Sequence, residues 1–375
     1  MLIGIDASRG VTAERTGTEA YAYFLIRALI AQTADRGHRL ALYYNQPPPP
    51  NYLPSAPHVT PIVIPFARLW SHLRLGLYLQ QHPPDVFFTP AHVIPISYKG
   101  AAIATVHDLG YRFFPEAHPR RQRYYLHWST AHNCRRSRYV VADSQATKRD
   151  LMAHYGVDGS KIVVVYPGID PELKRPFSTQ ITAVLDQHTI TPPYLLYLGT
   201  LQPRKNLVRL IEAYAASGLA TANTPTQLVI AGKVGWLAQP ILNAIDQLAP
   251  AIKQQVRLPG YIAEEDKAAL LAGATALLFP SLYEGFGFPV LEAQACETAV
   301  IAANTSSLPE VAGEAAILVD PLDAAAISQA MIRLCQEPAL RQNLILAGSQ
   351  NKNRFSWEQA AAKIVDICEK VARQN

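Results

Sequence analysis

The sequence predicts an α/β protein with two doubly wound domains, each built on a parallel sheet that helices cover on both faces. Two observations support this fold class. Short runs rich in β-branched and aromatic residues alternate with helical patterns along nearly the whole chain, as in sheets made of strand–helix–strand units. The chain also has 375 residues, of which 49% are hydrophobic and 17% charged, and this length exceeds what one ordinary core accommodates.

The first half opens with a buried strand at Leu2–Ala7, a loop containing glycine and threonine, and a helix at Glu19–Thr33. Further runs with the length and composition of strands are Arg39–Tyr44, Pro61–Phe66, Asp85–Pro90, Ala101–Asp108, Arg138–Ser144 and Lys161–Gly168. Helical periodicity is found at Ala67–Gln81, Arg120–Ser137 and Lys148–Gly156. We therefore expect a first domain at residues 1–172.

Residues 173–193 are rich in proline and lack apolar periodicity, so we expect a linker there. The alternation then restarts and predicts a second domain at 194–355. Its expected strands are Tyr194–Gly199, Gln227–Gly232, Gln255–Tyr261, Ala276–Ser281, Ala299–Asn304 and Ala315–Asp320. Its expected helices are Asn206–Ala216, Trp236–Leu248, Glu264–Ala274 and Pro289–Cys296. A final helix at 356–375 carries an apolar face and must dock on another element.

Composition excludes several function classes. The net charge of +5 is modest and no nucleic-acid-binding pattern is present, so we expect no nucleic-acid partner. The four cysteines are far apart without CxxC spacing, which favours free thiols in a reducing, cytoplasmic compartment over disulfides or metal ligands. No apolar run reaches the roughly 18 residues that span a bilayer, so any membrane contact is expected to be peripheral.

The stretch SLYEGFGFPVLE at Ser281–Glu292 combines acceptors, bare backbone and a helix start. Gly285 and Gly287 let the main chain approach a ligand, and the proline that follows suits the first turn of a helix. Glu284 and Glu292 then flank N–H groups that attract an anion. The pattern fits a ligand with hydroxyls and phosphate; an ordinary strand–loop–helix connection with first-turn charges fits it equally well.

Loops after other predicted strands offer further candidates, because open α/β sheets bind ligands at the carboxyl ends of their strands. Arg204 and Lys205 precede a helix, where they suit a diphosphate or are a solvated basic helix start. His107 ends a strand and either hydrogen-bonds a substrate hydroxyl, relays a proton or has a structural role. Tyr261 and Ile262 could line one side of a base-binding site, although a turn at the preceding glycine is a simpler explanation of this strand end.

Two further strand ends carry weaker signals. The loop at residues 15–18 follows the first strand and offers backbone donors to phosphate, but it lacks GxGxxG spacing. Asp143 and Ser144 end another strand and lead into a helix, so we interpret them as a structural helix cap.

The segment SLYEGFGFPVLEAQACETAVIAAN resembles the signature of glycosyltransferase family 4, the group 1 glycosyltransferases of GT-B fold, with two glutamates separated by seven residues in a glycine-rich loop. YLGTLQPRKNLVRLIEAY, VVADSQATKRDL, KIVVVYPGID, NTSSLPEVAGEAAILVDP and FSWEQAA resemble other family blocks, in the expected order. The resemblance implies an acceptor-binding first domain, a nucleotide-sugar-binding second domain, and a C-terminal helix that crosses back to the first.

The resemblance also implies residue roles. Glu284 and the backbone of Gly285, Phe286, Gly287 and Phe288 would hold the donor sugar and its phosphate, and Glu292 would receive the ribose hydroxyls. Arg204 and Lys205 would neutralise the diphosphate, Gly17 would let the first domain close, and His107 would lie beside the transferred sugar. The chain departs from the family pattern at Thr200, where many members have a phosphate-binding arginine, and at Thr18, where a second glycine is frequent.

The implied enzyme is a retaining glycosyltransferase with no enzyme nucleophile. It has no cofactor or metal, which agrees with the lack of Asp-x-Asp in the sequence. We expect it to move a hexose from UDP-glucose or GDP-mannose to a glycan or lipid-linked acceptor in polysaccharide biosynthesis. The alternatives are a nucleotide-sugar 2-epimerase of the same fold and a non-catalytic sugar-nucleotide-binding protein. The arginine-rich helix from Arg120 either meets an anionic membrane at its inner face or is an ordinary solvated helix.

Overall fold

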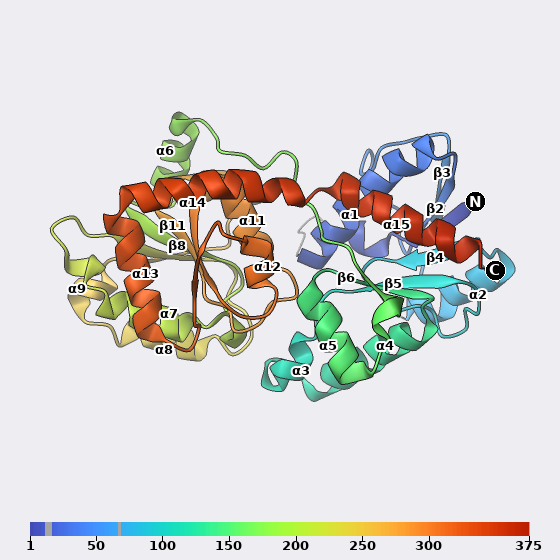
Figure 1. Ribbon diagram of the computed structural model, residues 1–375, viewed down its shortest axis with the longest axis horizontal. Helices are drawn as coiled ribbons and strands as arrows, with labels where there is room; N and C mark the ends of the chain where they lie inside the picture. Colours follow the sequence, from blue (N-terminus) through green and yellow to red (C-terminus); the bar gives the residue numbers. More distant parts are fainter. Residues whose placement is uncertain (12–16, 67–68, 375) are drawn as a thin grey trace. The chain divides into compact units, whose positions relative to one another are not determined.

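A computed structural model of the protein describes residues 1–11, 17–66 and 69–374 (Figure 1). The described residues form two compact units. Unit 1 comprises residues 1–112, 119–168 and 355–375, and unit 2 comprises 113–118 and 169–354. Each unit is a parallel sheet with helices on both faces, which confirms the predicted α/β fold class.

Unit 1 contains a sheet in the order β3-β2-β1-β4-β5-β6-β7, with every described strand parallel to its neighbours. The strands are β1 (Leu2–Asp6), β2 (Arg39–Tyr44), β3 (Val59–Val63), β4 (Val86–Thr89), β5 (Ala102–Val106), β6 (Tyr139–Ala142) and β7 (Ile162–Val164). Strands β4 and β5 are buried along their whole length, because helices cover both of their faces. The strand order reverses between β1 and β4, where doubly wound sheets bind ligands at the carboxyl edge.

The helices of unit 1 lie on the two faces of this sheet. Helices α1 (Gly17–Asp35) and α15 (Trp357–Ala372) cover one face (Figure 1). The other face carries α2 (Gly76–Gln81), α4 (Arg120–Arg136) and α5 (Gln145–Tyr155), with a π-helical turn η2 (Ser71–Leu75) leading directly into α2. Shorter helical turns are η1 (Ser8–Val11), α3 (Gly110–Phe113), η3 (Pro115–Ala117) and η4 (Gly159–Lys161).

The C-terminal helix α15 packs on α1 in unit 1, so the predicted docking of this helix on the first domain is confirmed. The ring of Trp357 lies 5.6 Å from that of Tyr21 and 5.8 Å from that of Phe24, centroid to centroid. Gly168, the last residue of the preceding segment of unit 1, passes so close that a Cβ there would overlap the backbone nitrogen of Trp357. A glycine is therefore required where the two segments meet.

We expect Gly168→Ala to lower the stability of unit 1 by about 1–3 kcal/mol, the usual cost of overpacking. The matched control is Gly159→Ala, because a Cβ at Gly159 meets only the flexible side-chain ends of Met152 and Lys148. Thermal unfolding of both variants checks this. A Tm for Gly168→Ala as high as that of the control would show that α15 moves aside without loss.

Unit 2 contains a second parallel sheet in the order β10-β9-β8-β11-β12-β13. The strands are β8 (Tyr194–Leu198), β9 (Gln227–Ala231), β10 (Val256–Gly260), β11 (Ala276–Phe279), β12 (Ala299–Ala303) and β13 (Ile317–Val319). Helices α7 (Leu207–Ala216), α8 (Gln239–Asp246) and α13 (Ala324–Gln336) cover one face; α6 (Ser178–Gln187), α10 (Glu264–Gly273), α11 (Phe288–Ala295) and α14 (Pro338–Asn351) cover the other (Figure 1). Short helices are α9 (Pro250–Lys253) and α12 (Leu308–Ala312), with helical turns η5 (Pro203–Lys205), η6 (Leu219–Thr221) and η7 (Lys352–Arg354).

The segment 173–193, where the sequence predicts a linker, contains helix α6 and lies within unit 2. Ile181 and Leu185, one turn apart, are buried, and α6 packs on α10. Composition alone did not indicate this helix, because the prolines before and after it lower the apolar content of the whole segment. The structure therefore replaces the bare linker with a helix of the second unit.

Candidate active site

Two loops of unit 2 meet at the carboxyl ends of the adjacent strands β8 and β11. The first contains Arg204 and Lys205 in the turn η5, and the second contains Glu284. A backbone hydrogen bond from Leu282 N to Arg204 O, 2.8 Å long, ties the loops together. Arg204 Nη1 then donates to Glu284 Oε2 at 2.9 Å, and Lys205 Nζ donates to Glu284 Oε1 at 2.6 Å. One carboxylate thus joins both predicted phosphate-binding cations.

This cluster is largely buried, with 9% of the Glu284 side chain and 11% of the Lys205 side chain exposed. Burial alone would raise the pKa of Glu284, but the charges of Arg204 and Lys205 and their hydrogen bonds outweigh it and lower the pKa to about 2. Glu284 is therefore ionised at neutral pH. Because its charge offsets only one of the two cations, the cluster carries a net positive charge where the sequence predicts a diphosphate.

The glycine-rich loop is held by two serines that the sequence-based prediction did not assign. Ser306 Oγ accepts a hydrogen bond from Glu284 N at 3.0 Å. Ser307 Oγ lies 2.5 Å from the carbonyl oxygen of Phe286, to which it donates, and 3.0 Å from that of Glu284. Both serines follow β12 and lie in the block NTSSLPEVAGEAAILVDP, which resembles a block of the family. The resemblance therefore marked this segment but assigned no role to either serine. Their hydroxyls preorganise the loop.

Helix α11 begins at Phe288 with Pro289 in its first turn, as the sequence predicts. Gly287 precedes it with φ of 119°, a left-handed conformation that side chains disfavour, and a Cβ there would lie 2.7 Å from Leu308 Cδ2. Gly285 and Phe286 complete the loop between Glu284 and this helix start. Pro289 has no N–H and Val290 N donates to Gly287 O at 3.0 Å, so the attraction of this helix start for negative charge comes from the helix dipole.

Glu292 lies on α11, and its carboxylate is held by a residue that the sequence-based prediction missed. Lys267 Nζ, on the neighbouring helix α10, donates to Glu292 Oε1 at 3.0 Å and pairs with Glu264 Oε2 at 2.7 Å. Burial lowers the pKa of Lys267, but the two glutamates outweigh burial and raise it above its ordinary value. Lys267 thus stays charged and holds the carboxylate of Glu292, whose side chain remains partly exposed.

Tyr261 and Ile262 follow β10 at the same edge of the sheet but differ in exposure. Tyr261 is 48% exposed, with Lys233 Nζ 4.6 Å from its ring centroid. Ile262 is buried, so it can offer a ligand only its main chain. The neighbouring loop after β9 exposes Trp236 and Val234, which the sequence-based prediction did not single out. These side chains form an apolar rim at the carboxyl end of β9 and β10.

His107 lies in unit 1 after β5 and forms a partly buried pair with Asp143. His107 Nδ1 donates to Asp143 Oδ2 at 2.6 Å, and Asp143 is 2% exposed. Burial lowers the pKa of His107, but the carboxylate of Asp143 outweighs it and raises the pKa above its ordinary value. Ser144 caps α5 by accepting from Thr147 N at 3.0 Å, as the sequence predicts. Asp143, interpreted from sequence as part of that cap, instead orients His107.

The structure distributes the predicted site residues over both units. The glycine-rich loop, the two cations, Glu292 and Tyr261 belong to unit 2, whereas His107 and Gly17 belong to unit 1. Gly17 is the exposed first residue of α1, and the preceding residues 15 and 16 of its loop lie outside the described residues. Within the described ranges, no group of three or more His, Cys, Asp and Glu side chains could hold a metal ion.

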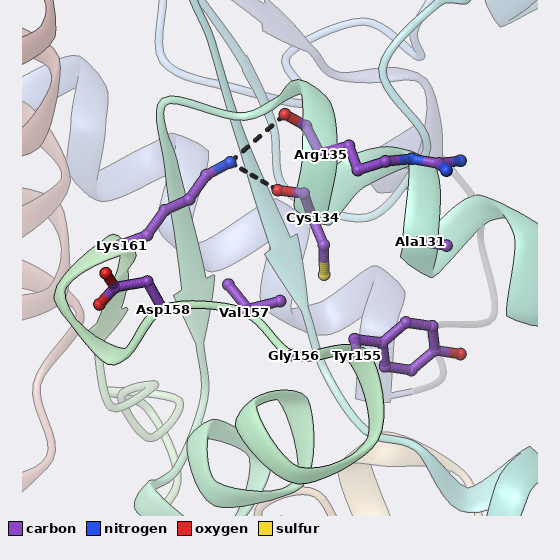
Figure 2. Close-up of a pocket in the computed structure, with 8 residues that line it drawn as sticks. All are labelled: Ala131, Cys134, Arg135, Tyr155, Gly156, Val157, Asp158 and Lys161. Atoms are coloured by element: carbon purple, nitrogen blue, oxygen red, sulfur yellow. Dashed lines mark hydrogen bonds between the residues drawn. The ribbon is translucent and has the colours of Figure 1, made fainter.

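A separate hollow of about 440 Å³ lies in unit 1 at the C-terminal end of α4 (Figure 2). Lys161 Nζ donates there to the carbonyl oxygens of Cys134 at 2.6 Å and Arg135 at 3.3 Å, groups that the helix leaves unpaired. Burial raises the pKa of the Cys134 thiol to about 11, which keeps it neutral and unreactive. We therefore assign Lys161 and Cys134, which line the hollow, structural roles and not a catalytic one.

Comparisons with known proteins identify the family. The model of "Glycosyltransferase Family 4" matches residues 15–173, and that of "Glycosyl transferases group 1" matches 184–351, so that together they cover most of the chain. The chain belongs to the group 1 glycosyltransferases. It is therefore a glycosyltransferase of GT-B fold, as the sequence resemblance predicts.

Individual relatives agree with this assignment. O-antigen chain mannosyltransferase B of Escherichia coli is 27% identical over 82% of this chain and 80% of its own length. Sucrose-phosphate synthase from Thermosynechococcus elongatus superposes with a TM-score of 0.76 at 20% identity, covering 100% of both chains. Alr3699/HepE of Anabaena, solved with UDP-glucose, superposes with a TM-score of 0.69 at 18% identity over 97% of this chain and 99% of its own. At these identities the two structural matches establish the fold alone.

No helix among the described residues has the length and apolar character needed to cross a membrane.

Proposed function

We propose that this group 1 glycosyltransferase is a retaining, metal-independent hexosyltransferase. It would move a hexose from a nucleotide diphosphate sugar to a glycan or lipid-linked acceptor in polysaccharide biosynthesis. The observation that carries the proposal is the cluster of Arg204, Lys205 and Glu284 at the carboxyl ends of β8 and β11. A lipid-linked acceptor implies a peripheral location at the inner, cytoplasmic face of a membrane.

The leaving group of the reaction is a nucleoside diphosphate, whose negative charge grows as the sugar departs. Arg204 and Lys205 are fixed by Glu284 before any ligand binds, so they meet this charge without reorganising. The dipole at the N-terminus of α11 acts in the same direction. These groups supply the electrostatic stabilisation that a metal ion provides in other enzymes, and we propose that no metal or other cofactor is needed.

The remaining contacts orient the donor. The backbone of Gly285, Phe286, Gly287 and Phe288 would hold the sugar and its phosphate, and Glu292, kept in place by Lys267, would accept the ribose hydroxyls. Tyr261 and the main chain of Ile262 would contact the base. Glu284 is not a nucleophile in this account, because both of its oxygens are engaged by cations.

For the donor we favour GDP-mannose over UDP-glucose. O-antigen chain mannosyltransferase B of Escherichia coli is 27% identical to this chain, whereas the Anabaena protein solved with UDP-glucose is 18% identical. A panel of nucleotide sugars tests the choice by thermal shift. A donor present at about a hundredfold over its Kd stabilises the folded state by about 2.7 kcal/mol, which raises the Tm by several degrees.

The variant Glu292→Ala is expected to reduce that shift and to lower transfer at least about tenfold, because a hydrogen bond to a charged group is worth about 1.5–3 kcal/mol. Assays without acceptor separate the alternatives. Donor turnover to a C2 epimer would identify a 2-epimerase, and donor binding without transfer or hydrolysis would identify a non-catalytic binding protein. A full shift and full transfer in Glu292→Ala would remove the ribose role of Glu292.

A further inference from the structure

Unit 1 exposes a row of leucines that its fold does not use. Leu69, Leu73 and Leu77 are 66%, 47% and 54% exposed. Leu73 lies on the π-helical turn η2 and Leu77 on α2, which continues it. Leu69 precedes this helix with a φ of 54°, and its carbonyl oxygen accepts a hydrogen bond from Leu73 N at 3.0 Å. Leu73 and Leu77, four residues apart, lie on one side of this helix, and together with Leu69 before it they expose three leucines to solvent.

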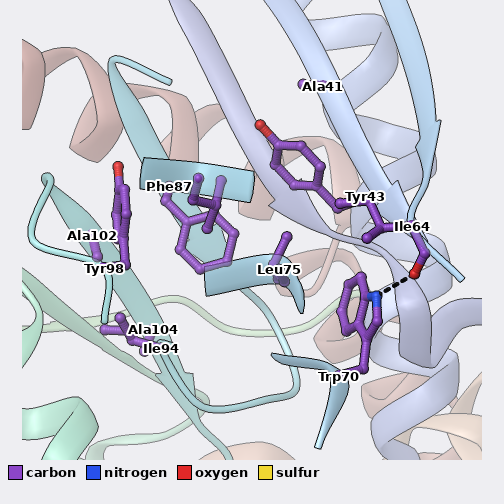
Figure 3. Packing of buried hydrophobic residues seen from close by; sticks show 11 residues of the cluster. Ala41, Tyr43, Ile64, Trp70, Leu75, Phe87, Ile94, Tyr98, Ala102 and Ala104 are labelled. Atoms are coloured by element: carbon purple, nitrogen blue, oxygen red, sulfur yellow. Dashed lines mark hydrogen bonds between the residues drawn. The ribbon is translucent and has the colours of Figure 1, made fainter. Parts of the chain in front are cut away.

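The opposite side of the same helix already supplies the hydrophobic core. Leu75 and Leu79 are completely buried, and Trp70 is buried with its indole N–H donating to Ile64 O at 2.7 Å (Figure 3). The helix is therefore anchored without the exposed leucines. Leaving a leucine in water forgoes about 1.5–3 kcal/mol of burial free energy, which an external apolar partner would recover.

Helix α4 contacts the segment that carries these leucines. The ring of His72, next to Leu73, lies 5.6 Å from that of Trp128 on α4. Tyr124 and Tyr125, one turn before Trp128 and on the same side of α4, are 69% and 48% exposed. We call the surface formed by Leu69, Leu73, Leu77, Tyr124 and Tyr125 the leucine–tyrosine face.

The two segments that carry this face contain basic residues and no acidic ones. The sequence contains no aspartate or glutamate at residues 61–84, which carry the leucines, or at 117–142, which carry the tyrosines. Exposed arginines on these segments are Arg74, Arg120, Arg121, Arg135 and Arg138. An apolar helical side with aromatic residues and flanking arginines complements an anionic lipid surface, where the apolar groups enter the interface and the cations meet the headgroups.

We propose that the leucine–tyrosine face docks unit 1 on an anionic lipid bilayer. A second copy of the chain is a poorer occupant, because pairing two identical faces would bring arginines of the same sign together. The proposal does not depend on the donor or on the transfer reaction. It assigns a role to the exposed leucines, which an arginine-rich solvated helix does not explain.

Cosedimentation with vesicles tests the proposal. The full chain is mixed with vesicles of phosphatidylcholine alone or of phosphatidylcholine with phosphatidylglycerol, at low and high salt. We expect binding to the anionic vesicles at low salt, weaker binding at high salt, and little binding to neutral vesicles. Failure of the wild-type chain to sediment with anionic vesicles at low salt would overturn the proposal.

Two variants and a matched control identify the surface. The double variant Leu73→Glu/Leu77→Glu is expected to lower the partition constant at least about tenfold, because it removes apolar burial and adds charge that the lipid repels. Arg120→Glu/Arg121→Glu should lower it by a similar factor. Leu346→Glu changes an equally exposed leucine of unit 2 and should bind like wild type.

Circular dichroism and Tm verify that each variant is folded, as expected for exposed positions. Vesicle binding by Leu73→Glu/Leu77→Glu equal to that of Leu346→Glu would contradict the proposal. The proposal would also be contradicted if wild type formed a concentration-dependent dimer and did not bind vesicles, and if Leu73→Glu/Leu77→Glu abolished that dimer. Donor binding, measured separately, should be unchanged in all variants; its absence in wild type would refute the proposed donor site and leave the vesicle result standing.

Discussion

Replacing Lys205 with alanine is expected to lower the transfer rate by about 10²–10³-fold, the usual effect of removing one preorganised group that stabilises a developing negative charge. Lys205 Nζ lies 2.6 Å from Glu284 Oε1, so the lysine is already in place when donor binds. The substitution also breaks a buried ion pair, which costs up to about 3–5 kcal/mol. Since Arg204 still pairs with Glu284, we expect the lower end of this range and a folded protein.

Steady-state transfer and thermal unfolding measure the two effects separately. The control is Lys253→Ala, which removes an exposed lysine paired with Asp246 at 2.9 Å in the same unit and should leave both quantities unchanged. The double variant Lys205→Ala/Glu284→Ala should lose less than the sum of the single losses, because the residues act as a unit. Near-normal turnover of folded Lys205→Ala would count against its role at the diphosphate.

The second large effect is expected from Asp143→Asn, which should lower the transfer rate by about 10²-fold or more if His107 acts beside the transferred sugar. Asp143 touches no substrate in this account and is a positioning residue for His107. The substitution removes the carboxylate that contributes most to raising the pKa of His107, so this pKa should fall, although Asp108 and the backbone of Pro90 still oppose the effect of burial. The pH profile of transfer should therefore change together with the rate.

The pH dependence of stability has a defined sign. Because the pKa of His107 is raised in the folded state, its pairing with Asp143 contributes stability that is fully present below the unfolded pKa of about 6.5. That contribution is lost as pH rises through the folded pKa, at about 1.4 kcal/mol for each unit between the two values. The difference in unfolding free energy between wild type and Asp143→Asn should change in this direction across that window.

NMR titration of the His107 ring checks the cause directly. The resonance should titrate above the ordinary histidine value in wild type and at a lower pH in Asp143→Asn than in wild type. His154→Gln, which replaces a histidine near the end of α5, is the control and should leave the His107 titration unchanged. Equal His107 pKa values in wild type and Asp143→Asn would show that Asp143 does not set the pKa of His107.

Much of the fold was predictable because buried parallel strands are continuous apolar runs in the sequence. Arg39–Tyr44 coincides with β2, and the predicted Gln227–Gly232 exceeds β9 by one residue. Helices were harder to predict. The prediction omitted α13 and α14, although α13 buries Ile327, Met331 and Leu334 at helical spacing. Helix α14 buries only Gly348 completely, so its apolar pattern is weak.

The site was predictable by residue but not by partner. Sequence position after a strand, together with the family resemblance, singled out Arg204, Lys205 and Glu284. It did not indicate that all three form one ion cluster, because pairing across 79 residues depends on β8 and β11 being neighbours in the sheet. The same holds for Asp143 with His107, whose strands β6 and β5 lie side by side.

The central claim is that Arg204 and Lys205 meet the diphosphate of the donor without a metal ion. Titration calorimetry with GDP and GMP, both in EDTA, tests it most directly in wild type and Lys205→Ala. We predict that wild type binds GDP at least about tenfold more tightly than GMP, since a charge-assisted contact is worth about 1.5–3 kcal/mol, and that Lys205→Ala loses most of this preference. An unchanged preference in Lys205→Ala, or none in wild type, would contradict the claim.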